Sequence, residues 1–352
     1  MPSSSQPRSR ALQQHSHLRD DADERLRWLD LENDHLRLRV MNLGAITAWL
    51  DLRDGEIWQP MVLGYADMAA YLGDPYYLGA IVGRVANRIG GAGFHLAGRE
   101  VSLNANEGSN QLHGGAQGLG RVFWDMRRLG AGAVELRHFS ADGENGYPGG
   151  AHIRLRIAVS GTTVSYYMTA SVDQLTPISL AQHNYYTLGI KGDIWEHRLR
   201  SSAESYLPLR RDGVPTGEIA PTSGTRFDYR AGRSFAALDP ERLGTDIHVN
   251  FPPNASGDMR EVAQLGASNG VVMRVFSDQP GAQIYTASHL NSSCAARDGQ
   301  RLAPFSAVCI EPQGLPDAVN QPHFPSVMVD PGHPYRQKLL LKFSVAEREQ
   351  DG

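Results

Sequence analysis

The sequence has little lysine, no excess of positive charge and no long apolar run. Only Lys191, Lys338 and Lys342 are lysines among its 34 basic residues, so nearly all of its cations are arginines. The formal net charge of -4 gives no electrostatic reason to expect nucleic acid or an anionic membrane as partner. No apolar run approaches the roughly 20 residues of a membrane helix. We therefore expect neither a nucleic-acid partner nor a membrane span.

Cysteine is also scarce, because Cys294 and Cys309 are the only two. They show no CxxC spacing and cannot form a structural zinc site by themselves. Two free thiols in a reducing compartment are the expected state. The N-terminus lacks the apolar region of a secretory signal, and its acidic cluster argues against a transit peptide. These features predict a cytoplasmic protein.

The chain is long enough for one large β domain or two ordinary ones. No internal repeat, low-complexity linker or break in composition follows the polar N-terminus. We therefore predict a disordered polar extension over residues 1–24, one domain over 25–347 and a frayed end over 348–352. The oligomeric state is expected to be a monomer or a homodimer.

Apolar and polar residues alternate with a period of two over much of the chain. The clearest examples are residues 35–44, 152–161, 162–172 and 338–345. Such alternation is typical of antiparallel strands with one buried face. Helical patterns are few, with short helices expected within 66–73 and 238–244. With 37 glycines and 20 prolines, the sequence predicts an all-β fold, a large antiparallel β-sandwich with few short helices.

Four loop-like stretches concentrate polar residues that a sandwich core does not need. They are GAIVGRVANRIGGAGF (79–94), NEGSNQLHGG (106–115), TPISLAQHNYYTLG (176–189) and VCIEPQGLPDAVNQPHFPS (308–326). A carboxylate directly after a buried strand loses hydration unless it has partners, which singles out Glu311. His113, His183 and Arg88 are each more often structural when taken alone.

Together these stretches resemble one family. The segments that carry the resemblance are GRVANRI, NEGSNQLHGG, DGENGYPG, TPISLAQHNYYTL, PTGEI, QPGAQIYT and EPQGLPDAVNQPHFPS. They are similar, in order from about residue 27 to 343, to signature stretches of the galactose mutarotase (aldose 1-epimerase) family. The resemblance implies a large β-supersandwich whose concave face holds a hexose.

The resemblance also implies a role for each matching residue. Glu311 would be the base at the C1 hydroxyl and His183 the acid at the ring oxygen, with His113 and Arg88 stabilising negative charge on that oxygen. The implied substrate-binding residues are Asn87, Arg88, Asp246 and Gln283. Interconverting α and β anomers needs only paired acid–base groups, so no cofactor and no metal are expected. The expected partner is a small-molecule sugar of the galactose or glucose type.

The sequence departs from the family pattern at two places. The family commonly has Asp-His-x-Phe where this chain reads Asp246-Ile247-His248-Val249-Asn250-Phe251, which leaves the register of this segment open. Gln182 and Thr187 stand beside His183 where the family usually has asparagine. These changes affect the expected substrate more than the expected reaction.

Several alternatives remain open at this point. A phosphorylated or pathway-specific sugar would need several arginines at the mouth of the site. A glycosidase could use Glu311 and Asp246 as its carboxylate pair, but it would leave the histidines without a clear task. A non-catalytic sugar-binding protein is the third alternative. A cupin-like metal site is disfavoured, because the body of the chain has no HxH pair followed by Glu and His.

Overall fold

A computed structural model describes residues 24–254 and 257–346. The extension predicted at 1–24, apart from Glu24, and the frayed end predicted at 348–352 lie outside the described residues. In the described part, no helix is long and apolar enough to cross a membrane.

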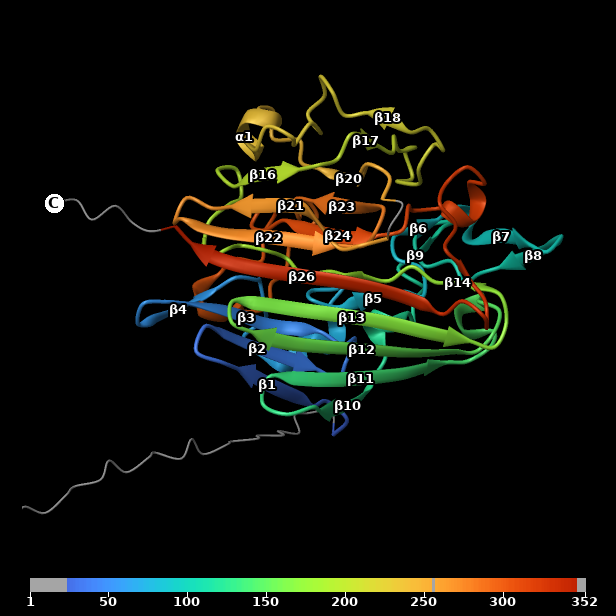
Figure 1. Cartoon of the computed structure of the whole chain (residues 1–352), viewed down its shortest axis with the longest axis horizontal. Coiled ribbons are helices and arrows are strands. Elements are labelled where there is room, and N and C mark those ends of the chain that lie inside the picture. Colours follow the sequence, from blue (N-terminus) through green and yellow to red (C-terminus); the bar gives the residue numbers. More distant parts are fainter. Residues whose placement is uncertain (1–23, 255–256, 347–352) are drawn as a thin grey trace, which may run out of the picture.

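The largest element is an antiparallel sheet of nine strands, which faces the viewer in Figure 1. Its strands, in spatial order, are β10 (Asp125–Arg128), β11 (Ala133–Ser140), β12 (Ala151–Ser160), β13 (Thr163–Val172), β26 (Tyr335–Val345), β22 (Val271–Ser277), β21 (Arg260–Gly266), β16 (Arg198–Ser201) and β19 (Arg233–Ser234). The predicted strands at 152–161 and 162–172 are β12 and β13. Gly161, with a φ of 53°, allows the tight turn between them.

Two further sheets pack against this one. The first contains β1 (Trp28–Glu32), β2 (Leu36–Met41), β3 (Thr47–Asp54) and β4 (Ile57–Pro60), in that order. The second contains β18 (Ala220–Pro221), β17 (Ser205–Tyr206), β20 (Asp246–Asn250), β23 (Gly281–Tyr285) and β24 (Cys309–Gln313). One buried apolar cluster joins all three sheets, including Leu38, Leu155, Ile284 and Leu341. The predicted antiparallel all-β sandwich is therefore confirmed.

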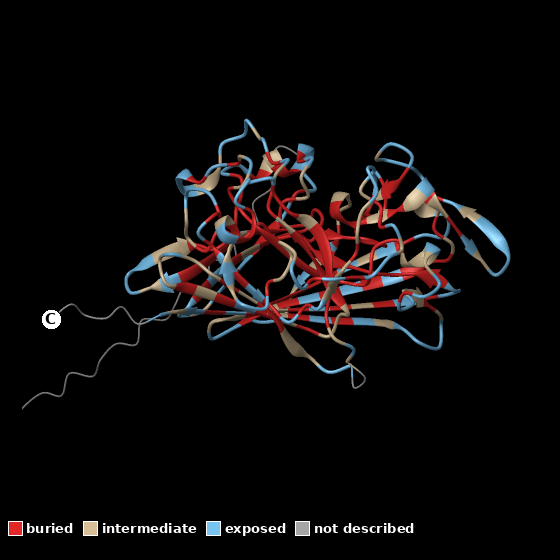
Figure 2. Cartoon of the chain, turned by 90° about the horizontal axis from the view of Figure 1, so that it is seen from above, coloured by how far each residue is buried: buried red, intermediate tan, exposed pale blue. Residues whose placement is uncertain are grey.

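Short two-stranded pairs carry the loops that reach the five-stranded sheet. They are β5 (Ile81–Val82) with β15 (Ala181–Gln182), β6 (Arg88–Ile89) with β9 (Gln111–Leu112), β7 (Gly93–Leu96) with β8 (Arg99–Ser102), and β14 (Thr176–Pro177) with β25 (Met328–Val329). In Figure 2 the loops and short pairs rise above the sheets, and buried segments run through the middle of the molecule.

Helices are few and short, as expected. The 3₁₀ helices are η1 (Met68–Gly73), η2 (Gly90–Ala92), η3 (Leu119–Arg121), η4 (Glu144–Gly146), η5 (Arg297–Gly299) and η6 (Ala318–Asn320). The helix predicted within 66–73 is η1. The helix predicted within 238–244 is wrong, because α1 (Phe235–Leu238) ends where that segment begins. Asp239 precedes Pro240, and a residue before proline avoids the helical conformation.

Candidate active site

The five-stranded sheet has one polar face, and strand register places the residues on it. His248 on β20 pairs with Gln283 on β23, and Gln283 pairs with Glu311 on β24. Directly opposed residues point to the same face, so these three side chains form a row. The residues next to them on each strand, such as Ile284 and Ile310, point to the opposite face and into the apolar core. Asp246, two residues before His248 on the same strand, lies on this polar face as well.

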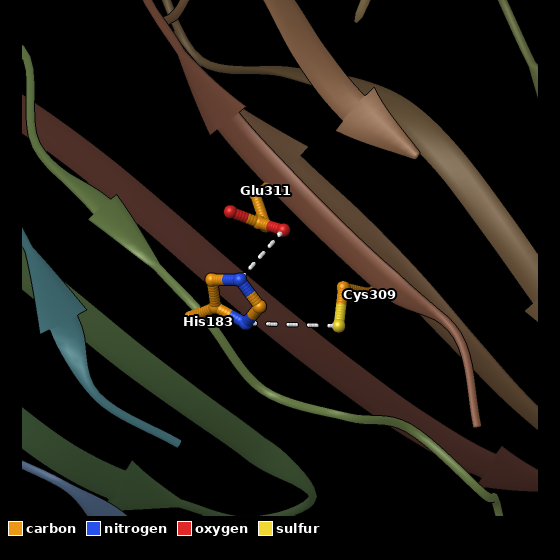
Figure 3. Close-up of side chains that lie close together, drawn as sticks. All are labelled: His183, Cys309 and Glu311. Carbon is orange, nitrogen blue, oxygen red and sulfur yellow. Dashed lines mark hydrogen bonds and ion pairs between the residues drawn. The ribbon is translucent and has the colours of Figure 1, made fainter. Parts of the chain in front are cut away.

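His183 lies opposite this row and is held by its own backbone. It follows β15, and its N–H donates to the carbonyl of Ala80 at 2.8 Å. Its Nε2 is 3.6 Å from Oε1 of Glu311, and its Nδ1 is 3.7 Å from Sγ of Cys309 (Figure 3). The side chains of His183 and Glu311 are 7% and 2% exposed, so both nearly lack water. An acid–base pair is thus enclosed between two separate parts of the chain.

His113 stands beside His183, with ring centroids 5.3 Å apart in an edge-on arrangement. The backbone N–H of Asn87 donates to its Nδ1 at 3.2 Å. A neutral His113 therefore carries its proton on Nε2, which makes that atom a hydrogen-bond donor.

The turn after His113 depends on glycine. Gly114 has a φ of 82°, and a Cβ there would lie 1.9 Å from the carbonyl oxygen of Gly83. No other residue fits this close approach of two backbone segments. The Gly114 turn therefore fixes where His113 sits against Asn87.

A second set of polar contacts extends from the same sheet. Nε2 of Gln283 donates to Oδ1 of Asp246 at 2.6 Å. Oδ2 of Asp246 lies 4.0 Å from Nη1 of Arg88, on the facing strand β6. Arg88 also donates from Nε and Nη2 to the two carboxylate oxygens of Glu107, at 2.6 and 2.8 Å. Arg88 is therefore held between two carboxylates.

The structure brings all seven predicted residues together in one closed series of neighbours. In order they are Asn87, His113, His183, Glu311, Gln283, Asp246 and Arg88, which returns to Asn87 as its sequence neighbour. Four elements far apart in sequence contribute to it: β6, the Gly114 turn, the segment after β15 and the five-stranded sheet. A set of groups this dense can bind several hydroxyls and move protons at the same time.

Three residues at the site were not singled out from the sequence. Glu107 lies in a stretch that drew notice for His113, and nothing in the sequence pairs it with Arg88. Cys309 was interpreted only as a free thiol, although its spacing of two from Glu311 puts both side chains on one face of a strand. His248 was obscured by the uncertain register at Asp246.

Burial controls protonation at the site. It lowers the pKa of His183 to about 4. Burial, with the charge of Asp246, raises the pKa of the Glu311 carboxyl well above its usual range. The pKa of His113 is well below its ordinary value through burial and the nearby His183, Arg88 and Arg121. Over the interval between their two pKa values, His183 and Glu311 therefore hold one proton between them.

The only group of three possible metal ligands found among residues 24–254 and 257–346 is His183, Cys309 and Glu311, with ligand atoms within 4.8 Å of one another. Their closest contacts use opposite nitrogens of the His183 ring. His183 therefore bridges Glu311 and Cys309 in this group.

A cavity of about 690 Å³ reaches the same sheet at Asn250. Its lining also includes Ser179 and Gly314 but none of the seven residues. This hollow is therefore separate from the site.

Comparison with known proteins gives one consistent result. A model of the aldose 1-epimerase family matches residues 27–342. The chain is 37% identical to the galactose mutarotase of Bos taurus over 328 residues, covering 90% of this chain and 93% of that protein. It is 30% identical to the aldose 1-epimerase of Escherichia coli K12 over 331 residues, covering 90% and 95%.

Solved structures agree. A GalM/aldose epimerase homologue from C. elegans superposes with a TM-score of 0.86 at 26% identity, covering 92% of this chain and 100% of that one. A galactose 1-epimerase from Lactobacillus acidophilus NCFM superposes with a TM-score of 0.81 at 25% identity, covering 94% and 98%.

Proposed function

The chain belongs to the aldose 1-epimerase family of isomerases, and from this we propose that it interconverts the α and β anomers of a free aldohexose of the galactose or glucose type. The observation that carries the proposal is the enclosed pair of His183 and Glu311, 3.6 Å apart. Anomer exchange needs one group that takes a proton and one that gives a proton, and this pair supplies both.

At rest, the pKa values place the shared proton on Glu311. In the proposed reaction, ring opening begins from the tautomer in which that proton has moved to His183 and Glu311 is ionised. Glu311 takes the proton of the C1 hydroxyl while Nε2 of His183 gives a proton to the ring oxygen. The bond between C1 and the ring oxygen breaks, and C1 becomes an aldehyde carbon. After rotation about the C1–C2 bond, Glu311 returns its proton to the aldehyde oxygen and His183 takes one from the hydroxyl. The ring closes and the pair again holds one proton.

The neighbouring residues would stabilise charge and orient the sugar. Nε2–H of His113 would donate to negative charge that develops on the ring oxygen, and Arg88 would add positive potential there. Asn87, Asp246 and Gln283 would hold the remaining hydroxyls. Asp246 can accept a hydrogen bond from a sugar hydroxyl and Gln283 can donate one to it, so together they can satisfy both its donor and its acceptor.

The charges around the site favour a sugar without phosphate. Arg88 is the cation among the seven residues, and both Glu107 and Asp246 lie against it. Glu311 adds a further acidic group. A phosphate bound at Arg88 would face these carboxylates, whereas neutral hydroxyls meet no such penalty.

Kinetics of two variants test the proposal. Glu311→Gln and His183→Asn should each lower kcat for anomer exchange at least about 100-fold, the lower range for loss of one acid–base group. Glu261→Gln, which alters an ion pair with Arg274 on the nine-stranded sheet, is the matched control. Circular dichroism and thermal melting establish that each variant is folded. A fully active Glu311→Gln enzyme would contradict the mechanism.

A further inference from the structure

We propose that Glu107 determines substrate specificity by occupying the guanidinium of Arg88, so that the site rejects anionic sugars. This inference rests on the proposed function and deepens it, because it names a residue that excludes phosphorylated substrates. Nothing in the sequence marked Glu107 for this role.

Each of the three guanidinium nitrogens of Arg88 lies within 4.0 Å of a carboxylate oxygen. Nε and Nη2 bind the two oxygens of Glu107 at 2.6 and 2.8 Å, and Nη1 lies 4.0 Å from Asp246. A phosphate group prefers the same two-pronged contact with a guanidinium. An anionic ligand that makes this two-pronged contact through Nε and Nη2 would therefore have to displace Glu107.

The next arginines around the site are engaged as well. Arg210 lies close to Gly90, two residues after Arg88, since a Cβ placed on Gly90 would be 3.2 Å from its Nη2. Arg210 binds Asp212 through two nitrogens at 3.2 and 3.1 Å. Arg121 packs over the Tyr77 ring at 4.3 Å and donates to the carbonyl of Asp74. Arg210 is thus paired with a carboxylate, whereas the hydrogen bond of Arg121 goes to a neutral backbone carbonyl.

The Glu107 carboxylate is held in place by its own turn. The backbone N–H of Glu107 donates to the carbonyl of Asn110 at 3.1 Å, and the N–H of Asn110 donates back at 2.9 Å. The Asn110 side chain accepts a hydrogen bond from the N–H of Gly91 at 3.0 Å, which ties the turn to the strand end beside Arg88. The ion pair is therefore part of the folded loop.

The test compares anion binding by the parent protein and Glu107→Gln. Inorganic phosphate and D-glucose 6-phosphate are the probes, at constant ionic strength, with Kd from calorimetry and inhibition constants from exchange of α-D-galactose. Removing one negative charge beside Arg88 should tighten binding of both probes at least tenfold, since unit charges at such range interact strongly in a partly buried site. Glu261→Gln is the matched control, because its carboxylate pairs with Arg274 and is 31% exposed, against 35% for Glu107. It should leave both constants unchanged.

Two further results decide the role of Arg88. The double variant Arg88→Met/Glu107→Gln should lose the gain in phosphate affinity, and a persistent gain would overturn the inference. Unchanged phosphate affinity in Glu107→Gln and Glu107→Ala, with only a higher KM for galactose, would also overturn it. Calorimetry needs no turnover, so a parent protein that fails to exchange anomers refutes the proposed function separately.

Discussion

Acidification should destabilise this protein in a way that can be worked out from its buried histidines. Burial lowers the pKa of His248 to about 3, and no hydrogen-bond partner within the described ranges reaches either ring nitrogen. Burial also holds the pKa of His113 well below its ordinary value. In the unfolded chain both imidazoles titrate near 6.5. Below that pH the unfolded state binds protons that the folded state does not bind, so the free energy of unfolding decreases as the pH falls.

His183 and Glu311 act on this loss in opposite directions. The unfolded chain gains a proton on His183, but the folded protein holds one on Glu311, whose pKa is raised. These two effects oppose each other.

His113 and His248 together contribute an uptake of about two protons on unfolding, a slope of about 2.7 kcal/mol per pH unit well below pH 6.5. Burial lowers the pKa of His138 and His197 as well, and these histidines act in the same direction. From pH 8 to pH 5, His113 and His248 should lower the free energy of unfolding by about 4 kcal/mol, a large part of a typical total of about 5–15 kcal/mol.

Urea unfolding followed by tryptophan fluorescence at several pH values measures this loss directly. His248→Gln should reduce the loss by about 2 kcal/mol, because the contribution of this one imidazole is gone. His95→Gln, which replaces an exposed imidazole on the β7–β8 hairpin, is the matched control and should leave the pH dependence unchanged. A parent protein whose unfolding free energy changes by less than about 1 kcal/mol between pH 8 and pH 5 would refute the reasoning.

Two further predictions concern activity. Exchange activity should fall near pH 4, where His183 takes up a second proton for the pair, and at alkaline pH, where Glu311 loses the proton that its raised pKa had retained. A pH profile of kcat checks this prediction. The absence of an acid limb down to pH 3 would contradict it. Gly114→Ala should lower both the melting temperature and kcat, because the alanine Cβ would lie 1.9 Å from the Gly83 carbonyl oxygen and displace His113. A normal melting temperature and a normal exchange rate would show that the turn tolerates a side chain.

Much of the fold could be predicted because alternation is a local property. The segments at 152–161 and 162–172 carry strict alternation, and they pair as β12 and β13. Helix α1 was misplaced because its cap, Ser234, accepts from the N–H of Ala237 in a segment with only four helical residues. Such a short element gives no periodic signal in the sequence.

The candidate site, like the fold, could be predicted from the sequence only in part. The seven residues were identified through a resemblance, and the structure places them in one series of neighbours. Contacts that depend on how distant strands meet could not be predicted. The Glu107–Arg88 pair joins a turn to β6, and His248 reaches the polar face only through the register of β20 against β23. Neither is encoded in a local pattern.

The most direct test of the central claim is exchange NMR on α-D-galactose and α-D-glucose, following the anomeric protons with the parent protein and with Glu311→Gln. The account predicts that the parent protein accelerates α–β exchange on at least one of these sugars and that Glu311→Gln does not. No acceleration by the parent protein on either sugar, or equal acceleration by the variant, would contradict it.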